Sequence, residues 1–250
     1  MAGRHRLDVC DRRSDVTLPP GQHAITGFPR FGTHLNHPPP AVPVNPMIEI
    51  NGTVTQPFAV PLADLATLPR RELTADFHCV AGWSATDLTW EGVAFETFYR
   101  TIIEPSVPPD TSITHVGFVG LDGFRSIVAI EDAMADDVLI AEQLNGQPLN
   151  GDHGAPARLI SPNQYGFVST KHLCGIEVHT AEPKQKYHPS PMTNLGLQLV
   201  KPHRRARVWE EERHRYLPAW FVRPFYRHVI AVIRSLSARG NTRATPPAPE

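Results

Sequence analysis

Residues 139–173 read LIAEQLNGQPLNGDHGAPARLISPNQYGFVSTKHL, a stretch in which short apolar runs alternate with loops rich in Gly, Asn and Pro. The runs Val138–Leu144, Arg158–Ile160 and Leu173–Thr180 predict three strands. Residues 145–156 concentrate the residue types that favour turns, so they predict a loop. The stretch therefore predicts a β-rich region whose loops carry polar side chains.

Outward from this stretch, the apolar pattern predicts further strands and a few short helices. Strands are expected at Met47–Thr55, Arg71–Val80, Ile113–Val119 and Phe124–Ile130, with a hairpin turn signal at Asn51-Gly52. Helices are expected at Leu62–Leu68, Phe95–Ile103 and Glu131–Ala135. The 26 prolines among 250 residues disfavour an all-helical bundle. We therefore expect an α+β fold with mixed, mostly-β sheets, short helices and long loops.

Composition and charge limit the class of protein. Hydrophobic residues make up 41% of the chain, which excludes global disorder, and the net charge of −1 argues against a generic nucleic-acid binder. No run of 18 apolar residues occurs, and no apolar stretch follows Arg12-Arg13, so we expect neither a membrane span nor an export signal. The three cysteines (Cys10, Cys79 and Cys174) are too few for a disulfide scaffold and favour a cytoplasmic location.

The charge is unevenly spread along the chain. Residues 1–200 carry a net charge of −8, whereas residues 201–250 carry 11 basic and 4 acidic residues, a net charge of +7. We expect a Pro-rich extended arm over 1–46 that packs on the body, a central domain over 47–184, and a basic helical extension over 185–250 with a disordered end. Residues 219–236 place apolar groups opposite arginines, so this helix either packs on the acidic body or, through 201–240, docks to an acidic partner or an anionic membrane surface.

The segment HCVAGWS (residues 78–84) is the first candidate site, because it follows a predicted strand and contains a glycine turn. A thiolate at Cys79 would attack electrophiles or bind a soft metal. Trp83 and His78 would shape a pocket beside it. The alternative is that Cys79 is a small buried apolar residue and that Trp83 is a packing residue.

Two turns within 139–173 carry cations and form the second candidate site. His153 and Arg158, five residues apart around a tight turn, suit the grip of a phosphate or a heterocycle. Ser169, Thr170 and Lys171 offer hydroxyls, backbone amides and a cation, which suits an anion. The alternative for both turns is a solvated surface loop.

Other chemistries lack their sequence motifs. The chain contains no CxxC or HExxH zinc spacing, no GxSxG, no CxxCH haem site and no GxGxxG dinucleotide fingerprint. Redox work by this chain would therefore pass its electrons through a separate partner.

Taken in order, these segments resemble the sulfite oxidase family of molybdopterin-dependent oxidoreductases. The resemblance covers about residues 45–182, and residues 28–33 (FPRFGT) also resemble the stretch before the first strand in bacterial members. The matching pieces are INGTV (50–54), PLADLATLP (61–69), HCVAGWS (78–84), WEGV (90–93), DGF (122–124), the stretch 139–173 and Ile176-Glu177.

The resemblance implies one pyranopterin (molybdopterin) cofactor whose dithiolene holds molybdenum. Cys79 falls on the cysteine that completes the thiolate set of the metal. His153 and Arg158 fall on positions that contact the pterin and its phosphate. The central domain over 47–184 would then be the molybdopterin-binding oxidoreductase domain.

Further positions are carried over from the same resemblance. Ser169, Thr170 and Lys171 fall on the loop that closes over the pterin and its phosphate. Asn36-His37 resembles an Asn-His pair of other members, and Gly120 lies near a position that is often threonine.

The sequence also departs from the family. Sulfite oxidases carry arginines just after the metal-binding cysteine, whereas the uncharged residues 81–84 (AGWS) stand here, which argues against sulfite as the substrate. The residues after Lys184 are basic and helical in pattern, so we expect no immunoglobulin-like dimerisation domain.

We therefore expect a molybdenum-pyranopterin oxidoreductase that catalyses two-electron oxygen-atom transfer on a small substrate other than sulfite. A separate electron-transfer partner would serve it, and nucleic acid would not be a partner. One alternative is a non-catalytic molybdopterin-binding or carrier protein of the same fold. Another is a metal-free thiol enzyme that uses Cys79 with His78 as its base.

Overall fold

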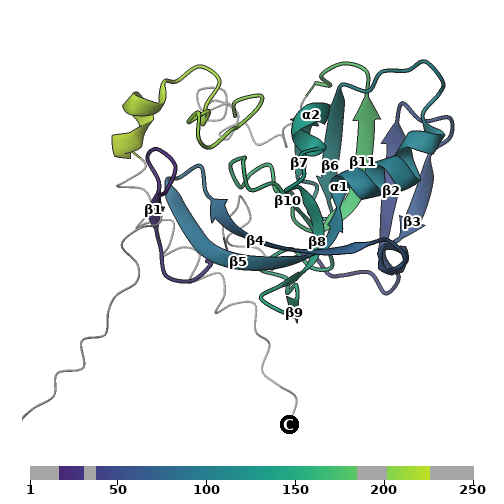
Figure 1. Cartoon of the computed structure of the whole chain (residues 1–250), viewed down its shortest axis with the longest axis horizontal. Coiled ribbons are helices and arrows are strands. Elements are labelled where there is room, and N and C mark those ends of the chain that lie inside the picture. Colours follow the sequence, from purple (N-terminus) through teal and green to yellow (C-terminus); the bar gives the residue numbers. More distant parts are fainter. Residues whose placement is uncertain (1–16, 31–37, 185–201, 226–250) are drawn as a thin grey trace, which may run out of the picture.

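Two β-sheets form the frame of the protein, whose computed structural model describes residues 17–30, 38–184 and 202–225 (Figure 1). In the first sheet the order is β1 (His23–Ala24), β5 (Trp83–Ala94), β8 (Leu139–Leu144) and β10 (Arg158–Ile160), with β4 (Arg70–His78) on β5 and β9 (Gln147–Pro148) on β8. In the second the order is β3 (Phe58–Pro61), β2 (Met47–Gly52), β11 (Leu173–His179), β6 (His115–Gly120) and β7 (Arg125–Ala129).

The helices are short and lie between the strands. They are η1 (Leu62–Thr67), α1 (Phe95–Phe98) with its continuation η2 (Tyr99–Ile103), η3 (Glu104–Ser106) and α2 (Ile130–Ala133). The strand pairs β1–β5 and β2–β11 are parallel, and the other pairs are antiparallel. The predicted α+β fold with mixed sheets, short helices and long loops is thus confirmed.

Strand β5, the longest in the described chain, was not predicted from the sequence. Its pairing with β4 is interrupted by a register shift between Ala75 and Phe77. Opposite the shift, Asp87 adopts a φ of +58°, and its N–H donates to Asp76 Oδ1 over 3.0 Å. This bulge breaks the alternation of apolar and polar residues, which is why the pattern of β5 is hard to read.

Two apolar cores lie against the sheets. The larger covers the five-stranded sheet and includes Phe95, Phe98 and Phe118. The smaller surrounds the connection between β4 and β5 and includes Trp83 and Trp90. The candidate cysteine therefore lies in a core of its own, at the far end of the long β4–β5 pair from the five-stranded sheet (Figure 1).

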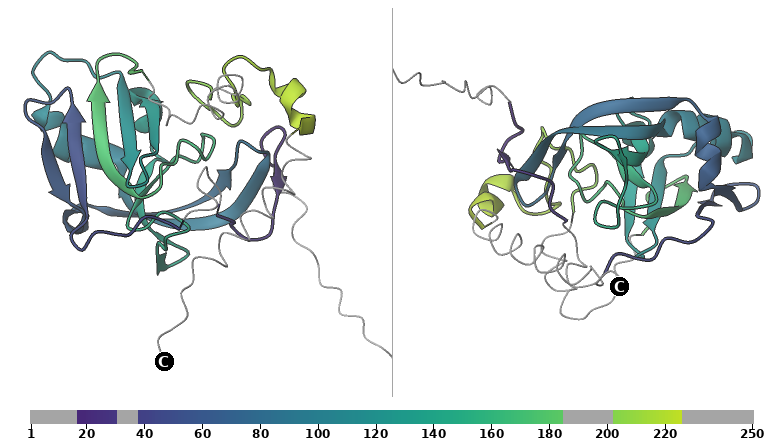
Figure 2. Two further views of the ribbon diagram at one scale, coloured as in Figure 1. Left: turned by 180° about the vertical axis from the view of Figure 1, so that it is seen from behind. Right: turned by 90° about the horizontal axis from the view of Figure 1, so that it is seen from below.

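Residues 202–225 form a segment that lies beside β1 in every view (Figures 1 and 2). Its arginines pair with acidic side chains of the body: Arg205 with Glu131, and Arg207 with Asp132. Residues 219–225 are helical, and the remainder of the predicted helix, 226–236, lies outside the described residues. Within the described residues, we find no helix that is both long and apolar enough to cross a membrane.

Candidate active site

Cys79 sits in a tight turn between β4 and β5 and is 4% exposed. Its N–H donates to Trp83 O over 2.8 Å, and Gly82 N–H donates to Cys79 O over 2.9 Å. Gly82 has a φ of +89°, and a Cβ there would lie 3.0 Å from Gly21 O. Only glycine is free of strain at this position, so the turn depends on it.

The other end of the turn is held by a chain of hydrogen bonds through His78. The ring Nδ1 of His78 lies 2.8 Å from Ser84 Oγ, which in turn donates to Gln22 Oε1 over 3.1 Å. Since the hydroxyl gives its proton to Gln22, it accepts from His78, which therefore carries its proton on Nδ1. Gln22 Nε2 then donates to Cys79 O over 3.1 Å. His78 thus faces Ser84 through this nitrogen and helps to shape the turn.

Trp83 is 1% exposed and belongs to an aromatic cluster. Its ring centroid lies 6.1 Å from that of Phe77 and 6.4 Å from that of Phe28. Phe28 also stacks on His153, with centroids 4.7 Å apart and planes inclined by 10°. The two candidate sites predicted from the sequence are therefore joined through Phe28, a residue of the arm.

Arg158 is completely buried at the start of β10. Its guanidinium donates to three backbone carbonyls: His153 O over 2.9 Å, Ser169 O over 3.0 Å and Leu159 O over 3.4 Å. It also lies 5.3 Å from the ring centroids of both Phe77 and Trp90. Among the described residues it has no carboxylate partner, so its charge is unmatched.

The loop 169–171 closes against this arginine, but its side chains point in different directions. Ser169 Oγ accepts from Ser161 N–H over 3.2 Å. Thr170 Oγ1 lies 2.8 Å from Ser126 Oγ on β7, so its hydroxyl faces the sheet. Lys171 Nζ donates to Asp152 O over 2.6 Å, which places its charge beside the loop of His153.

Burial, with repulsion between neighbouring cations as a second cause, lowers the pKa values of the basic groups in this site. Burial, with Arg158 and Arg30 adding repulsion, lowers the pKa of Lys171 to about 7. Burial alone lowers the pKa of Arg158 to about 9. Burial, then Lys171 and Arg158, lowers the pKa of His153 to about 4. A bound anion would relieve all of these shifts.

Molybdopterin fits this donor set. The phosphate would meet the cations Arg158 and Lys171. His153 Nδ1 is buried and has no hydrogen-bond partner within the described chain, so it is available to a polar group of the pterin. Burial raises the pKa of the Cys79 thiol to about 12, while the Ala81 amide and the charges of Arg213 and Lys171 oppose the rise. The site thus holds a thiol that a soft metal would deprotonate and bind.

The remaining predicted residues are placed as follows. A Cβ at Gly120 would lie 2.4 Å from Lys171 O, so no side chain fits there and Gly120 supports the loop through its backbone. Asn36 and His37 lie outside the described residues. Cys174 is a free, half-buried thiol on β11.

Sequence reasoning missed several residues that hold the site together. Gln22 and Arg213 bind the carbonyls of the cysteine turn, and Arg30 lies 3.6 Å from Asp152 beside the cation cluster. None of them has a local pattern that marks it. Each comes from a segment more than 50 residues away from its partner, so only the fold brings them together.

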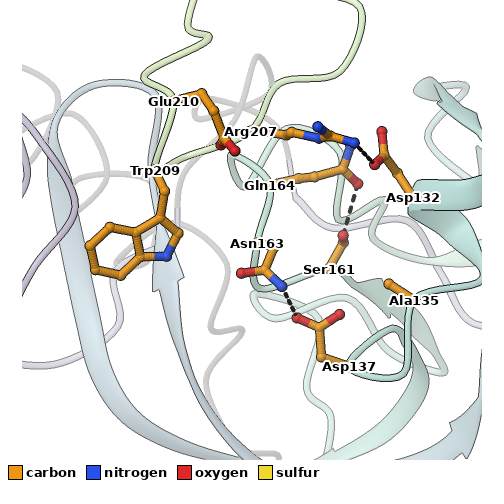
Figure 3. Close-up of a pocket in the computed structure, with 9 residues that line it drawn as sticks. All are labelled: Asp132, Ala135, Asp137, Ser161, Asn163, Gln164, Arg207, Trp209 and Glu210. Atoms are coloured by element: carbon orange, nitrogen blue, oxygen red, sulfur yellow. Dashed lines mark hydrogen bonds and ion pairs between the residues drawn. The ribbon is translucent and has the colours of Figure 1, made fainter.

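A separate cavity of about 270 Å³ lies between α2, the residues after β10 and the C-terminal segment (Figure 3). Trp209, Glu210 and Arg207 reach into it from the C-terminal segment, opposite Asp137 and Asn163 (Figure 3). No residue predicted for the site lines this cavity.

Comparison with known proteins identifies the family of the central region. The family model described as the oxidoreductase molybdopterin binding domain matches residues 36–187. An uncharacterized oxidoreductase of Bacillus subtilis, YuiH, is 29% identical over 209 residues, which cover 81% of this chain and 95% of YuiH.

Two further similarities are more distant. The protein-methionine-sulfoxide reductase catalytic subunit MsrP of Campylobacter jejuni is 25% identical over 194 residues, 71% of this chain but only 64% of MsrP. The chain thus spans just under two thirds of that relative. The sulfane dehydrogenase SoxCD of Paracoccus pantotrophus superposes with a TM-score of 0.48 at 23% identity, over 56% of this chain and 39% of that chain.

Proposed function

The chain belongs to the family of oxidoreductases with a molybdopterin-binding domain, and from this we propose that it catalyses two-electron oxygen-atom transfer on a small uncharged substrate. The family makes the chain a molybdopterin-dependent oxidoreductase. Our proposal concerns the substrate, the roles of the site residues and the electron-transfer partner.

The observation that carries the proposal is the buried charge of Arg158, which has no carboxylate partner among the described residues. A buried cation without a carboxylate is costly unless a ligand supplies the counter-charge. Lys171 and His153 lie close enough to Arg158 for their charges to interact, and the aromatic cluster links His153 to the cysteine turn. We assign the binding of the pterin and its phosphate to these three residues.

Each residue then has a role. Arg158 and Lys171 bind the phosphate, and His153, held by its stack on Phe28, donates to or accepts from the pterin. Cys79, with its thiol deprotonated, would hold molybdenum through Sγ. When bound, the cofactor supplies the two-electron redox change that oxygen-atom transfer needs. Trp83 and the buried turn keep water from the thiolate.

The substrate is proposed from the charge of the turn and from the relatives. Residues 81–84 place no cation beside Cys79, so an anion such as sulfite has no counter-charge in the sequence after the metal ligand. MsrP is named a protein-methionine-sulfoxide reductase. A sulfoxide is neutral and accepts two electrons and two protons to give a thioether and water, so it is the first substrate to test.

A metal-free thiol enzyme fits the site less well. A thiol with a pKa of about 12 is almost wholly protonated at neutral pH. Its proposed base, His78, is bonded to Ser84 through Nδ1, and burial lowers the pKa of the ring, which makes it a weaker base. A non-catalytic molybdopterin carrier remains the second candidate, because it would use the same binding residues.

The electron donor is proposed to be a separate protein. MsrP is named a catalytic subunit, which supports a partner for the present chain. Tyr216, Trp220, Phe221 and Phe225 are 61–72% exposed on the C-terminal segment. The sequence from 213 to 236 contains five arginines and no acidic residue, but Arg213 is buried. We propose the four exposed aromatic side chains, which lie in this basic stretch of the sequence, as the docking site for an acidic redox protein. We also propose a cytoplasmic location, which cell fractionation would test.

The experiment that tests the function is dye-linked turnover. Protein from a host that makes molybdopterin is supplied with reduced viologen and methionine sulfoxide, and dye oxidation is followed. We expect turnover by the parent protein and none by Cys79→Ser. Molybdenum-loaded protein that oxidises no dye with any sulfoxide or N-oxide would instead favour the carrier.

A further inference from the structure

Arg213, on the C-terminal segment, reaches the turn that carries Cys79. It is 2% exposed although it lies in the most basic part of the chain. Its Nη1 donates to Val80 O over 2.5 Å, a contact between residues 133 positions apart. Val80 directly follows Cys79, so this bond acts on the backbone of the turn itself.

The same guanidinium fixes the arm against the turn. Nη2 donates to Pro20 O over 3.2 Å and to Gly21 O over 3.1 Å. A Cβ at Gly21 would lie 2.8 Å from this Nη2, so the close approach requires glycine. Three segments, the arm, the turn and the C-terminal segment, therefore meet at one side chain.

The remaining faces of Arg213 are also occupied. Nε lies 3.4 Å from Glu211 Oε1, and the guanidinium lies 5.0 Å from the ring centroid of Tyr165. Glu211 also binds Arg223, which is about two-fifths exposed. The ring and the three carbonyls hold the guanidinium in one orientation. Unlike Arg158, Arg213 also has a carboxylate partner that balances its charge, so we interpret it as a structural group and not as a ligand-binding one.

The arm also forms hydrogen bonds with the turn. His23 N–H donates to Gly82 O over 3.1 Å, and Gln22 binds Cys79 O. The carbonyls of Cys79, Val80 and Gly82 thus all have partners outside the β4–β5 pair. Without the bond from Arg213, the only one to Val80 O in the described chain, the turn would lose its contact with the C-terminal segment.

We propose that Arg213 is a positioning residue for the metal-binding cysteine. It fixes the orientation of the turn, and through it the direction in which Cys79 Sγ presents to molybdenum. Residues that contact a metal ligand commonly fix its orientation, and in this way they influence the affinity and redox potential of the metal site. This inference rests on the proposed function only where it treats Cys79 as the metal ligand.

The test compares Arg213→Lys with Arg223→Lys in the full-length protein. Lysine keeps the charge but loses the planar fork. Arg223 is the matched control, because among the described residues it is bonded to the same Glu211 and not to the carbonyls of the turn. Hydrogen exchange is followed by mass spectrometry in a peptide spanning 77–84. With two or more hydrogen bonds lost, we expect exchange to rise about tenfold in Arg213→Lys, and to stay at the parent rate in Arg223→Lys. Peptides from β6 and β11 should be unchanged.

The second readout is the Mo(V) electron paramagnetic resonance spectrum of the loaded protein. We expect shifted g-values in Arg213→Lys and parent values in Arg223→Lys. The positioning role would be overturned if Arg213→Lys exchanged hydrogen at the parent rate. It would also be overturned if exchange became faster while the g-values stayed those of the parent. If Arg213→Lys does not fold, Glu211→Gln decides by the same two readouts, since it weakens the ion pair to Arg213 Nε. Glu211→Gln also weakens the pair with Arg223, for which Arg223→Lys is the control. Hydrogen exchange needs no turnover, so a failed sulfoxide assay leaves this test intact.

Discussion

The ring of Phe28 stacks on the imidazole of His153, with centroids 4.7 Å apart and planes inclined by 10°. Phe28 belongs to the arm, whereas His153 belongs to the loop after β9. Phe28 also meets the ring of Trp90 edge-on at 5.9 Å. The arm therefore sets the plane of the imidazole that we assign to the pterin.

Phe28→Leu should lower the molybdopterin content of the purified protein. Losing an aromatic pair costs about 0.5–1.5 kcal/mol, so binding should weaken about two- to tenfold. Pterin is measured as its fluorescent oxidation product. Phe58→Leu, on β3, is the matched control, and equal pterin content in both variants would rule out this role of the stack.

Arg158→Ala should weaken cofactor binding more strongly. A hydrogen bond to a charged group contributes about 1.5–3 kcal/mol, so affinity should fall at least tenfold. Molybdenum per chain, measured by mass spectrometry, reports the loss. Arg207→Ala, which removes an ion pair with Asp132, serves as the control. Unchanged molybdenum in Arg158→Ala would remove this residue from the site.

The stability of the cofactor-free protein should rise with pH between about 7 and 10.5, because burial lowers the pKa of Lys171 to about 7 from the ordinary lysine value of 10.5. In that window the unfolded chain holds the lysine proton and the folded chain does not, so raising the pH favours folding by up to about 1.4 kcal/mol per pH unit. Urea unfolding at pH 7.5 and 8.5 measures the slope. Lys171→Met should reduce this dependence of stability on pH, whereas Lys184→Met should leave it unchanged. The same slope in the parent and both variants would contradict the attribution of the slope to Lys171.

Removing exposed aromatic side chains should separate docking from catalysis. Trp220→Ser with Phe221→Ser should keep dye-linked turnover, since both residues are exposed and contact each other. Turnover driven by the natural donor in cell extract should fall. The control is Val44→Ser, which removes an apolar side chain that is 97% exposed. Unchanged turnover with cell extract would contradict the proposed protein partner. Loss of binding to anionic vesicles would contradict it too, because the surface would then bind a membrane.

The sequence predicted the parts of this protein whose information is local. The turn at Gly82, the strands β6, β7, β8 and β11 and the short helix α1 each have a pattern within a few residues. The cysteine and the cations were found in the same way, from short segments and their resemblance to a family. Strand β5 was missed because the bulge at Asp87 interrupts its alternation.

What the sequence could not predict is how distant segments meet. No local pattern pairs Phe28 with His153, or Arg213 with Val80. Thr170 was predicted at the anion loop, but its hydroxyl faces Ser126 on β7, a direction fixed by the packing of the sheet. Such contacts depend on the whole fold, and they are the ones that orient the site.

The most direct test of the account is the number of sulfur ligands on molybdenum, measured by X-ray absorption in the parent protein, Cys79→Ser and Cys174→Ser. Serine is a hard, poorly ionised ligand, so it should not replace the thiolate. We predict that Cys79→Ser keeps much of its pterin but loses one sulfur ligand and nearly all turnover, whereas Cys174→Ser matches the parent. Parent-like sulfur coordination in Cys79→Ser, or its loss in Cys174→Ser, would contradict the placement of the site at the β4–β5 turn.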